Sequence, residues 1–84
     1  LFRTGGEEFV LLLPRTSALD AQQVAESLRA RIAETPLLPG HPITVSIGVG
    51  VQQPQHSADD WLIAADRALY RAKHAGRNRV EMSP

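Results

Sequence analysis

The chain has 84 residues, no cysteine, and nine basic side chains balanced by nine acidic ones. Its length limits it to one domain, and the lack of cysteine excludes a disulfide-stabilised module or a cysteine-rich zinc fold. The zero net charge argues against a general nucleic-acid binder, while the lack of a signal peptide or of an apolar run of ~18–20 residues predicts a cytoplasmic segment without membrane contact.

The first residues predict a hairpin of which one strand is cut short. Strand-like residues lead at once into Gly5-Gly6, which can adopt the positive φ values of a two-residue turn. Phe9–Leu13 follows as a continuous apolar run bounded by Pro14, which is typical of a strand buried on both faces. Because a hairpin needs two strands, we interpret the chain as the C-terminal part of a larger domain.

A helix is predicted to begin after Ser17, whose hydroxyl precedes Asp20 at the spacing of a capping box. Apolar residues then recur at intervals of three and four and predict one buried face, made of Ala21, Val24, Ala25, Leu28 and Ile32. Pro36 is expected to end the helix, because proline cannot continue its hydrogen-bond ladder.

Residues 43–51 alternate aliphatic side chains with Thr, Ser and Gly, a period of two that predicts a strand. One face of this strand is aliphatic, and the other is small enough for a second backbone or a ligand to approach closely. Ser57 and Asp60 then form another capping-box pattern, and Gly76 is placed to end the helix that follows. This helix is expected to bury Trp61, Leu62, Ala65, Ala68, Leu69 and Ala72, and a short strand is expected at Val80 and Met82.

Two charged clusters are candidates for chemistry. Lys73 and Arg77 flank Gly76 and can reach one point, as binding of a polyphosphate requires, although a solvated helix end is the plainer interpretation. Glu7 and Glu8 place two carboxylates on the glycine turn, where a nucleotide can approach the backbone and a hard cation such as Mg²⁺ can find oxygen ligands. Alone, such a tetrapeptide is most often a polar turn.

Other motif searches are negative. The chain has no Walker A loop, no GxGxxG after a strand and no serine in a nucleophile elbow. The three histidines, at positions 41, 56 and 74, lack metal-ligand spacing and are expected at the surface. Trp61 and Tyr70 are expected to pack in the core or at a helix edge and not to stack on bases.

Four segments together resemble the GGDEF family of diguanylate cyclases over essentially the whole chain. Residues 3–9 (RTGGEEF) resemble the signature turn in its GGEEF form, residues 44–50 (TVSIGVG) the TxSxGxa strand, residues 66–73 (DRALYRAK) the ADxALYxAK helix, and residues 76–78 the closing GRN. The resemblance implies an α+β fold. Residues 1–84 would be the C-terminal portion of one ferredoxin-like, nucleotidyl-cyclase palm domain, with an antiparallel sheet, packed helices and the order turn-β-α-β-α-β.

The resemblance also implies an activity: two facing domains of a homodimer condense two GTP into cyclic di-GMP, release pyrophosphate and use Mg²⁺ or Mn²⁺. Glu8 would ligate the metal, and Glu7 would assist at the metal or at the attacking 3′-hydroxyl, which makes these two the catalytic residues. The residues that would bind GTP are Gly5, Gly6, Lys73 and Arg77, the last two through the terminal phosphates.

Several family features would lie before Leu1: a first strand with a metal-binding Asp, the guanine contacts and the inhibitory RxxD motif. An upstream sensor or receiver domain is also expected. The first strand would lie between the strands at 9–13 and 43–51, so we expect the isolated chain to be inactive and these two strands to pair directly or with a second copy. A silent GGDEF module that binds nucleotide or a partner is the alternative, and an RNA-binding domain is poorly supported because Phe9 is the one aromatic residue in the strands after the turn.

Overall fold

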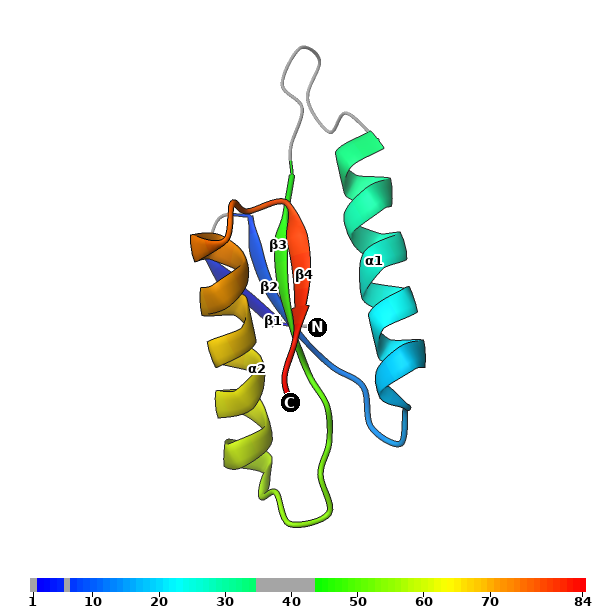
Figure 1. Ribbon diagram of the computed structural model, residues 1–84, viewed down its shortest axis with the longest axis vertical. Helices are drawn as coiled ribbons and strands as arrows, with labels where there is room; N and C mark the ends of the chain where they lie inside the picture. Colours follow the sequence, from blue (N-terminus) through cyan, green and yellow to red (C-terminus); the bar gives the residue numbers. More distant parts are fainter. Residues whose placement is uncertain (1, 6, 35–43) are drawn as a thin grey trace.

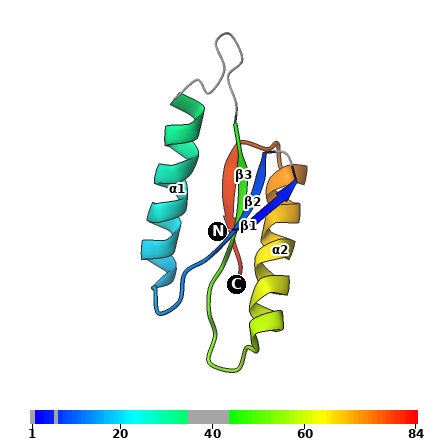
Figure 2. The ribbon, with the colours of Figure 1, turned by 180° about the vertical axis from the view of Figure 1, so that it is seen from behind.

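The computed structural model describes residues 2–5, 7–34 and 44–84. Within these ranges the order of elements is β1 (Phe2–Gly5), β2 (Glu8–Leu12), α1 (Ala18–Glu34), β3 (Ser46–Gly50), α2 (Ala58–His74) and β4 (Arg79–Met82). The strands form one sheet in the order β1-β2-β3-β4, and α1 and α2 cover its opposite faces (Figures 1 and 2). The predicted α+β class and the order of elements are therefore confirmed.

The prediction of an antiparallel sheet is wrong for most of the sheet. Among the described strands, only β1 and β2 run antiparallel, with Phe2 opposite Val10, whereas β2 with β3 and β3 with β4 run parallel. Each parallel pair is joined through a helix that returns the chain to the starting end of the sheet, which a tight turn cannot do. The predicted hairpin is confirmed with Gly5 opposite Glu8, while Gly6 and Pro36 lie outside the described residues.

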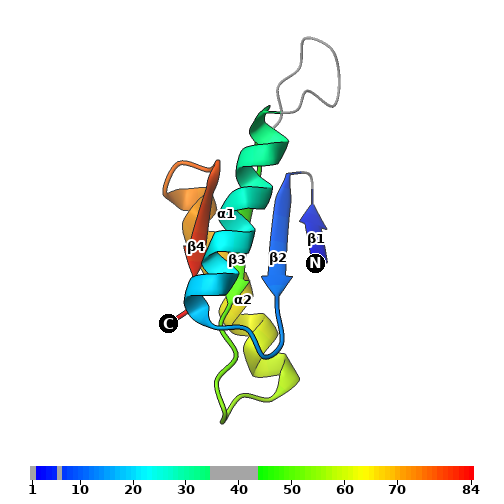
Figure 3. The ribbon, with the colours of Figure 1, turned by 90° about the vertical axis from the view of Figure 1, so that its right-hand side faces the viewer.

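β2 and β3 lie directly side by side, from Glu8 opposite Ser46 to Leu12 opposite Gly50. Of the two outcomes expected for these strands, direct pairing or pairing with a second copy, the structure contains the first. The sheet order advances in one direction from β2 to β4 although the two helices lie on opposite faces. The crossover from β2 through α1 to β3 is therefore right-handed, as Figure 3 shows from the α1 side. The crossover from β3 through α2 to β4 is left-handed, whereas crossovers between parallel strands are usually right-handed.

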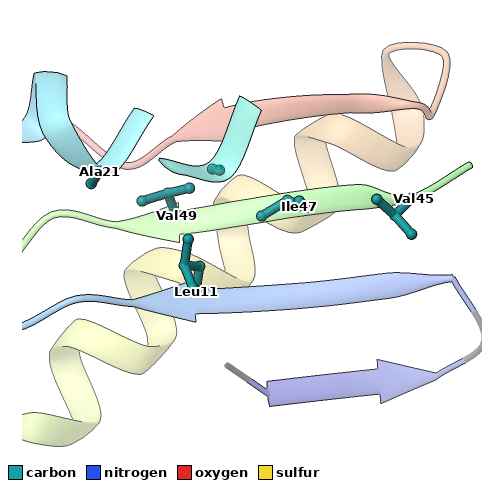
Figure 4. Packing of buried hydrophobic residues seen from close by; sticks show 6 residues of the cluster. Leu11, Ala21, Val45, Ile47 and Val49 are labelled. Atoms are coloured by element: carbon teal, nitrogen blue, oxygen red, sulfur yellow. The ribbon is translucent and has the colours of Figure 1, made fainter. Parts of the chain in front are cut away.

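Two apolar layers flank the sheet because alternate residues of β2 and β3 point to opposite faces. On the α1 side, Figure 4 shows the buried cluster, which consists of Leu11, Ala21, Ala25, Val45, Ile47 and Val49. On the α2 side, Val10 packs against Ala65 and Leu69. The prediction that the strand at 9–13 is buried on both faces is therefore confirmed.

The small face of β3 is occupied by helix α2. A Cβ on Gly48 would stand 2.3 Å from the carbonyl oxygen of Ala65 and 2.3 Å from the amide nitrogen of Leu69. At Gly50 the nearest atoms would belong to side chains, including Trp61 Cδ1 at 2.9 Å. The sequence allowed either a second backbone or a ligand to approach the small face of this strand, and at Gly48 the structure places the backbone of α2 there. This close contact keeps α2 on its face of the sheet.

Two residues predicted to be buried are exposed instead. Val24 is 49% exposed and Leu62 is 42% exposed, whereas the alanines and Leu69 of the predicted helix faces are buried. The stripe through Ala21 and Ala25 faces the sheet, which leaves Val24 on the outer flank of α1. Trp61 is half-buried, and its Nε1 donates to the carbonyl oxygen of Gly50 at 2.7 Å, in keeping with the packing role expected for it.

Both predicted helix caps are present. Ser57 Oγ accepts from the amide of Asp60 at 3.1 Å, and Asp60 Oδ2 accepts from the amide of Ser57 at 3.2 Å, which completes a capping box. At the start of α1, Ser17 Oγ accepts from the amide of Asp20 at 3.1 Å. These bonds satisfy amide groups that have no partner within the helix.

Loss of the α2 cap should have a measurable cost. We expect Ser57→Ala to lower the free energy of unfolding by about 1 kcal/mol in urea denaturation followed by circular dichroism.

The hydrogen bond from the backbone of Ser57 lowers the pKa of Asp60 below its ordinary value of 3.8. Because the folded pKa is the lower one, the stabilisation is present above pH 3.8 and is lost as the pH falls through the folded pKa.

The control for this pH dependence is Asp59→Asn, which removes the same charge from the same helical turn. Asp60→Asn should destabilise the chain more than Asp59→Asn at about pH 6, and the difference should shrink at about pH 2.5. An equal difference at the two pH values would contradict the role of the Asp60 carboxylate.

Candidate active site

Glu8, Lys73 and Arg77 form one charged cluster although the sequence separates them widely. Lys73 Nζ lies 3.3 Å and Arg77 Nη1 lies 3.6 Å from the same carboxylate oxygen, Glu8 Oε2. The Glu8 side chain is 21% exposed and that of Lys73 is 30% exposed, so both are partly shielded from solvent. The structure thus joins the acidic turn and the basic helix end that the sequence offered as two separate candidates.

The fold brings these residues together through the packing of β2 on α2. Side chains alternate along β2, so Glu8 points to the same face as Val10, which packs on Ala65 and Leu69 of α2. The C-terminal end of α2 lies beside the start of β2, at the orange and blue ends in Figure 1. The apolar contact between the two elements therefore sets the ion pair at one end of the helix.

Glu7 does not belong to this cluster. Its side chain is exposed, and its carbonyl oxygen accepts a hydrogen bond from the amide of Ser46 at 3.0 Å. Gly5 ends β1 opposite Glu8, and Gly6 lies outside the described residues. Of the predicted site residues that the structure describes, three are therefore in contact, and Glu7 and Gly5 flank them on the turn.

A left-handed turn carries Arg77 back toward Glu8. Helix α2 ends at His74, its C-cap residue is Ala75, and Gly76 follows with φ of 124°, which confirms the predicted glycine cap. The amide of Arg77 donates to the carbonyl oxygen of Ala72 at 3.0 Å, the long bond of a Schellman motif. This reversal lets Arg77, which lies beyond the helix, stand next to Lys73, which lies within it.

A pocket of about 210 Å³ opens beside the cluster and is lined by Glu8, Asp66, Leu69, Tyr70 and Lys73. Sequence reasoning had not assigned Asp66 or Tyr70 to the site. Their spacing of seven and three residues before Lys73 places them on its side of the helix, and that spacing was the available signal. Tyr70 is 62% exposed and stacks on His74 with ring centroids 4.1 Å apart, so it is a surface residue at the pocket rim.

A larger open depression of about 520 Å³ runs along α1, lined by residues such as Val24 and Arg31. It lies on the helix that covers the other face of the sheet, away from the Glu8 cluster. We assign the site to the smaller pocket because it contains the opposed charges that nucleotide chemistry needs.

The residues of this site fit a divalent metal in part. No group of three or more His, Asp or Glu side chains gathers in residues 2–5, 7–34 and 44–84. Mg²⁺ is commonly held by one or two carboxylates together with substrate phosphates and water. Glu8 fits that pattern as one carboxylate ligand, and Asp66 lines the same pocket.

The two histidines that the structure describes, His56 and His74, do not line the pocket beside Glu8. His74 is exposed, as predicted, and His41 lies outside the described residues. His56 is half-buried, and its Nδ1 has no hydrogen-bond partner in the part of the chain that the structure describes. Within that part, no helix is both long and apolar enough to cross a membrane.

Comparison with known proteins assigns the chain to a family. The family model described as "Diguanylate cyclase, GGDEF domain" matches residues 1–79. Similar proteins include Diguanylate cyclase DgcM of Escherichia coli strain K12, 49% identical over 95% of this chain and 20% of its own length. Diguanylate cyclase DgcP of Pseudomonas aeruginosa is 46% identical over 96% of this chain and 12% of its own length. Response regulator PleD of Caulobacter vibrioides is 37% identical over 93% and 18%, respectively.

The chain thus spans a fifth or less of the length of these three relatives. No solved structure gives a significant match to it.

Proposed function

The chain belongs to the GGDEF domain family of diguanylate cyclases, and we propose that it supplies part of the active site of an enzyme that condenses two GTP into cyclic di-GMP. The observation that carries the proposal is the meeting of Glu8 with Lys73 and Arg77 at one carboxylate oxygen. One end of α2 thereby offers two cations to phosphates, next to a carboxylate suited to a metal.

In the proposed reaction, the 3′-hydroxyl of one GTP attacks the α-phosphate of the other in line. Each attack forms one P–O bond, breaks the bond to the β-phosphate and releases pyrophosphate, while the hydroxyl loses its proton. Two such attacks close the ring, so two domains must face each other in a homodimer. Lys73 and Arg77 would hold the terminal phosphates by charge-assisted hydrogen bonds and stabilise the leaving pyrophosphate.

Glu8 would change partners when nucleotide binds. Its carboxylate now pairs with both Lys73 and Arg77 and so holds the two cations together. An incoming triphosphate carries more negative charge and would take over these cations, which frees Glu8 to ligate Mg²⁺ or Mn²⁺. When bound, such an ion stabilises charge on the attacking and leaving oxygens. Glu7, exposed on the turn, would assist at the ion or at the 3′-hydroxyl of the facing domain's GTP.

The wider context is also part of the proposal. PleD is named a response regulator, which supports an upstream receiver or sensor domain controlling the enzyme. GTP as substrate supports action in the cytoplasm, with any membrane anchor in other domains. We expect the 84-residue chain alone to be inactive. Glu7, Glu8, Lys73 and Arg77 would serve the metal and the phosphates, and none of them would contact the guanine base of GTP.

The test is to incubate the complete domain that contains residues 1–84 with GTP and Mg²⁺, after fusing it to a dimeric coiled coil. We expect cyclic di-GMP and pyrophosphate, detected by chromatography and mass spectrometry, and no product from the 84-residue chain alone. Absence of product from the forced dimer would contradict the proposed enzyme activity.

A catalytically silent module that binds nucleotide or a partner is the second candidate. The ion pairs of Glu8 favour it, because a carboxylate that already has two cationic partners is less available to a metal. This candidate predicts that the forced dimer binds GTP, seen by isothermal titration calorimetry, without turning it over.

A further inference from the structure

The turn that carries Arg77 has an unfavourable backbone conformation. Arg77 has φ of 60° and Asn78 has φ of 46°, directly after Gly76 at 124°. Asparagine tolerates this left-handed region, whereas a long side chain such as arginine rarely adopts it. Such a conformation persists only where the surrounding structure holds it in place. The position of Arg77 therefore depends on what anchors the turn.

The anchor on the far side of the turn comes from α1. Arg29 Nη1 donates to Asn78 Oδ1 at 2.8 Å, a contact between residues 49 positions apart. On the near side, the amide of Arg77 donates to the carbonyl oxygen of Ala72. The turn is thus held at both ends, once by its own helix and once by the helix on the opposite face of the sheet.

Arg29 is itself held in place. Its Nε donates to Glu26 Oε1 at 2.9 Å, and its Nη2 pairs with the same oxygen. The hydrogen bond from Arg29 lowers the pKa of Glu26, and the same bond raises the pKa of Arg29. One edge of the planar guanidinium is therefore fixed on α1, while Nη1 reaches Asn78.

We infer that Arg29 is a positioning residue for the phosphate-binding cations: through Asn78 it holds the turn that sets Arg77 beside Glu8 and Lys73. The inference rests on the proposed function, because the ligand of these cations is the triphosphate of GTP. It assigns to α1 a part in the site although α1 covers the other face of the sheet and supplies none of the residues that line the pocket beside Glu8.

The probe is inorganic tripolyphosphate, titrated into the chain by calorimetry at about 150 mM salt, where remote charges are largely screened. We expect Arg29→Ala to raise the dissociation constant about fivefold, and Arg77→Ala to raise it about tenfold, as for loss of a charge-assisted hydrogen bond. Arg31→Ala is the matched control, since it removes the same charge from the same helix, and it should change the constant less than about twofold.

Two further variants separate positioning from general stabilisation. Asn78→Gly keeps a residue that accepts positive φ but removes the acceptor for Arg29, so it should weaken binding about as much as Arg29→Ala. In a chain that already carries Arg77→Ala, adding Arg29→Ala should weaken binding no further. Additive effects of Arg29→Ala and Arg77→Ala, or an unchanged constant in both Arg29→Ala and Asn78→Gly, would overturn the inference.

Hydrogen exchange tests the inference without any ligand. Arg29→Ala should accelerate exchange of the Arg77 amide about tenfold, while the amide of Ala75, which bonds to Arg71 within the helix, stays unchanged. Equal exchange of the Arg77 amide in both chains would overturn the inference. If instead neither Lys73→Ala nor Arg77→Ala weakens tripolyphosphate binding, the proposed function loses its phosphate site, and the exchange result still decides the role of Arg29.

Discussion

Glu8→Gln in the complete domain is expected to lower the initial rate of cyclic di-GMP formation by at least about 10²-fold. Glutamine keeps the size of the side chain but removes the charge that would ligate a divalent ion and that now pairs with Lys73 and Arg77. The same variant should remain folded, because partly exposed ion pairs contribute at most ~1 kcal/mol each to stability. The measurement is the rate of product formation at saturating GTP, together with a thermal unfolding curve.

Glu34→Gln is the matched control for this variant. Glu34 is exposed at the end of α1 and does not line the pocket, so the substitution removes the same charge without removing a group of the proposed site and should leave the rate unchanged. A Glu8→Gln enzyme that retains half of the original rate would remove Glu8 from the catalytic site. A variant that binds GTP normally but forms no product would place the loss in the chemical step.

The second large effect is expected from Gly48→Ala, which should destabilise the chain by about 3 kcal/mol or more. The new Cβ would stand 2.3 Å from backbone atoms of α2, at Ala65 and Leu69, so the helix and the sheet would have to separate. That separation would also loosen the contact of Val10 with α2, which sets Glu8 against Lys73. Urea denaturation followed by circular dichroism measures the loss.

Gly50→Ala is the comparison for the same strand and the same added methyl group. There the Cβ would meet side-chain atoms at 2.8 to 2.9 Å, including Leu12 Cδ2 and Trp61 Cδ1, which can shift by rotation. We therefore expect a smaller cost of about 1–2 kcal/mol. Equal costs at Gly48 and Gly50 would show that the backbone contact does not limit the approach of α2.

Local features of the structure were predictable because their causes lie within a few residues. The capping box at Ser57 and Asp60 depends on a hydroxyl and a carboxylate three positions apart, and the structure contains both of its hydrogen bonds. The cap at Gly76 depends on one residue that accepts positive φ. The continuous apolar run at residues 9–13 predicted a strand buried on both faces, and the structure contains apolar contacts on both.

Strand direction was not predictable from such patterns. A period of two looks the same in a parallel and in an antiparallel strand, because it reports which faces are buried and not which strand is adjacent. The antiparallel sheet was implied by the family resemblance, in which another strand would separate β2 from β3; with neighbouring strands joined through helices, the pairs β2–β3 and β3–β4 run parallel instead. The prediction that Val24 is buried was wrong for a related reason. Helical spacing predicts which residues share one face of a helix, but the element that packs against the helix decides how wide the buried part of that face is.

The sequence by itself determined the zero net charge, the two capped helices, and the identity of the charged residues at either end of the site. Only the tertiary structure decided that the balanced charges meet, with Lys73 and Arg77 on one oxygen of Glu8. It also decided that Arg29 reaches Asn78 across 49 positions. The physical reason is that contacts between distant residues depend on how helices pack on a sheet, and that packing is set by the whole apolar core and not by any local pattern.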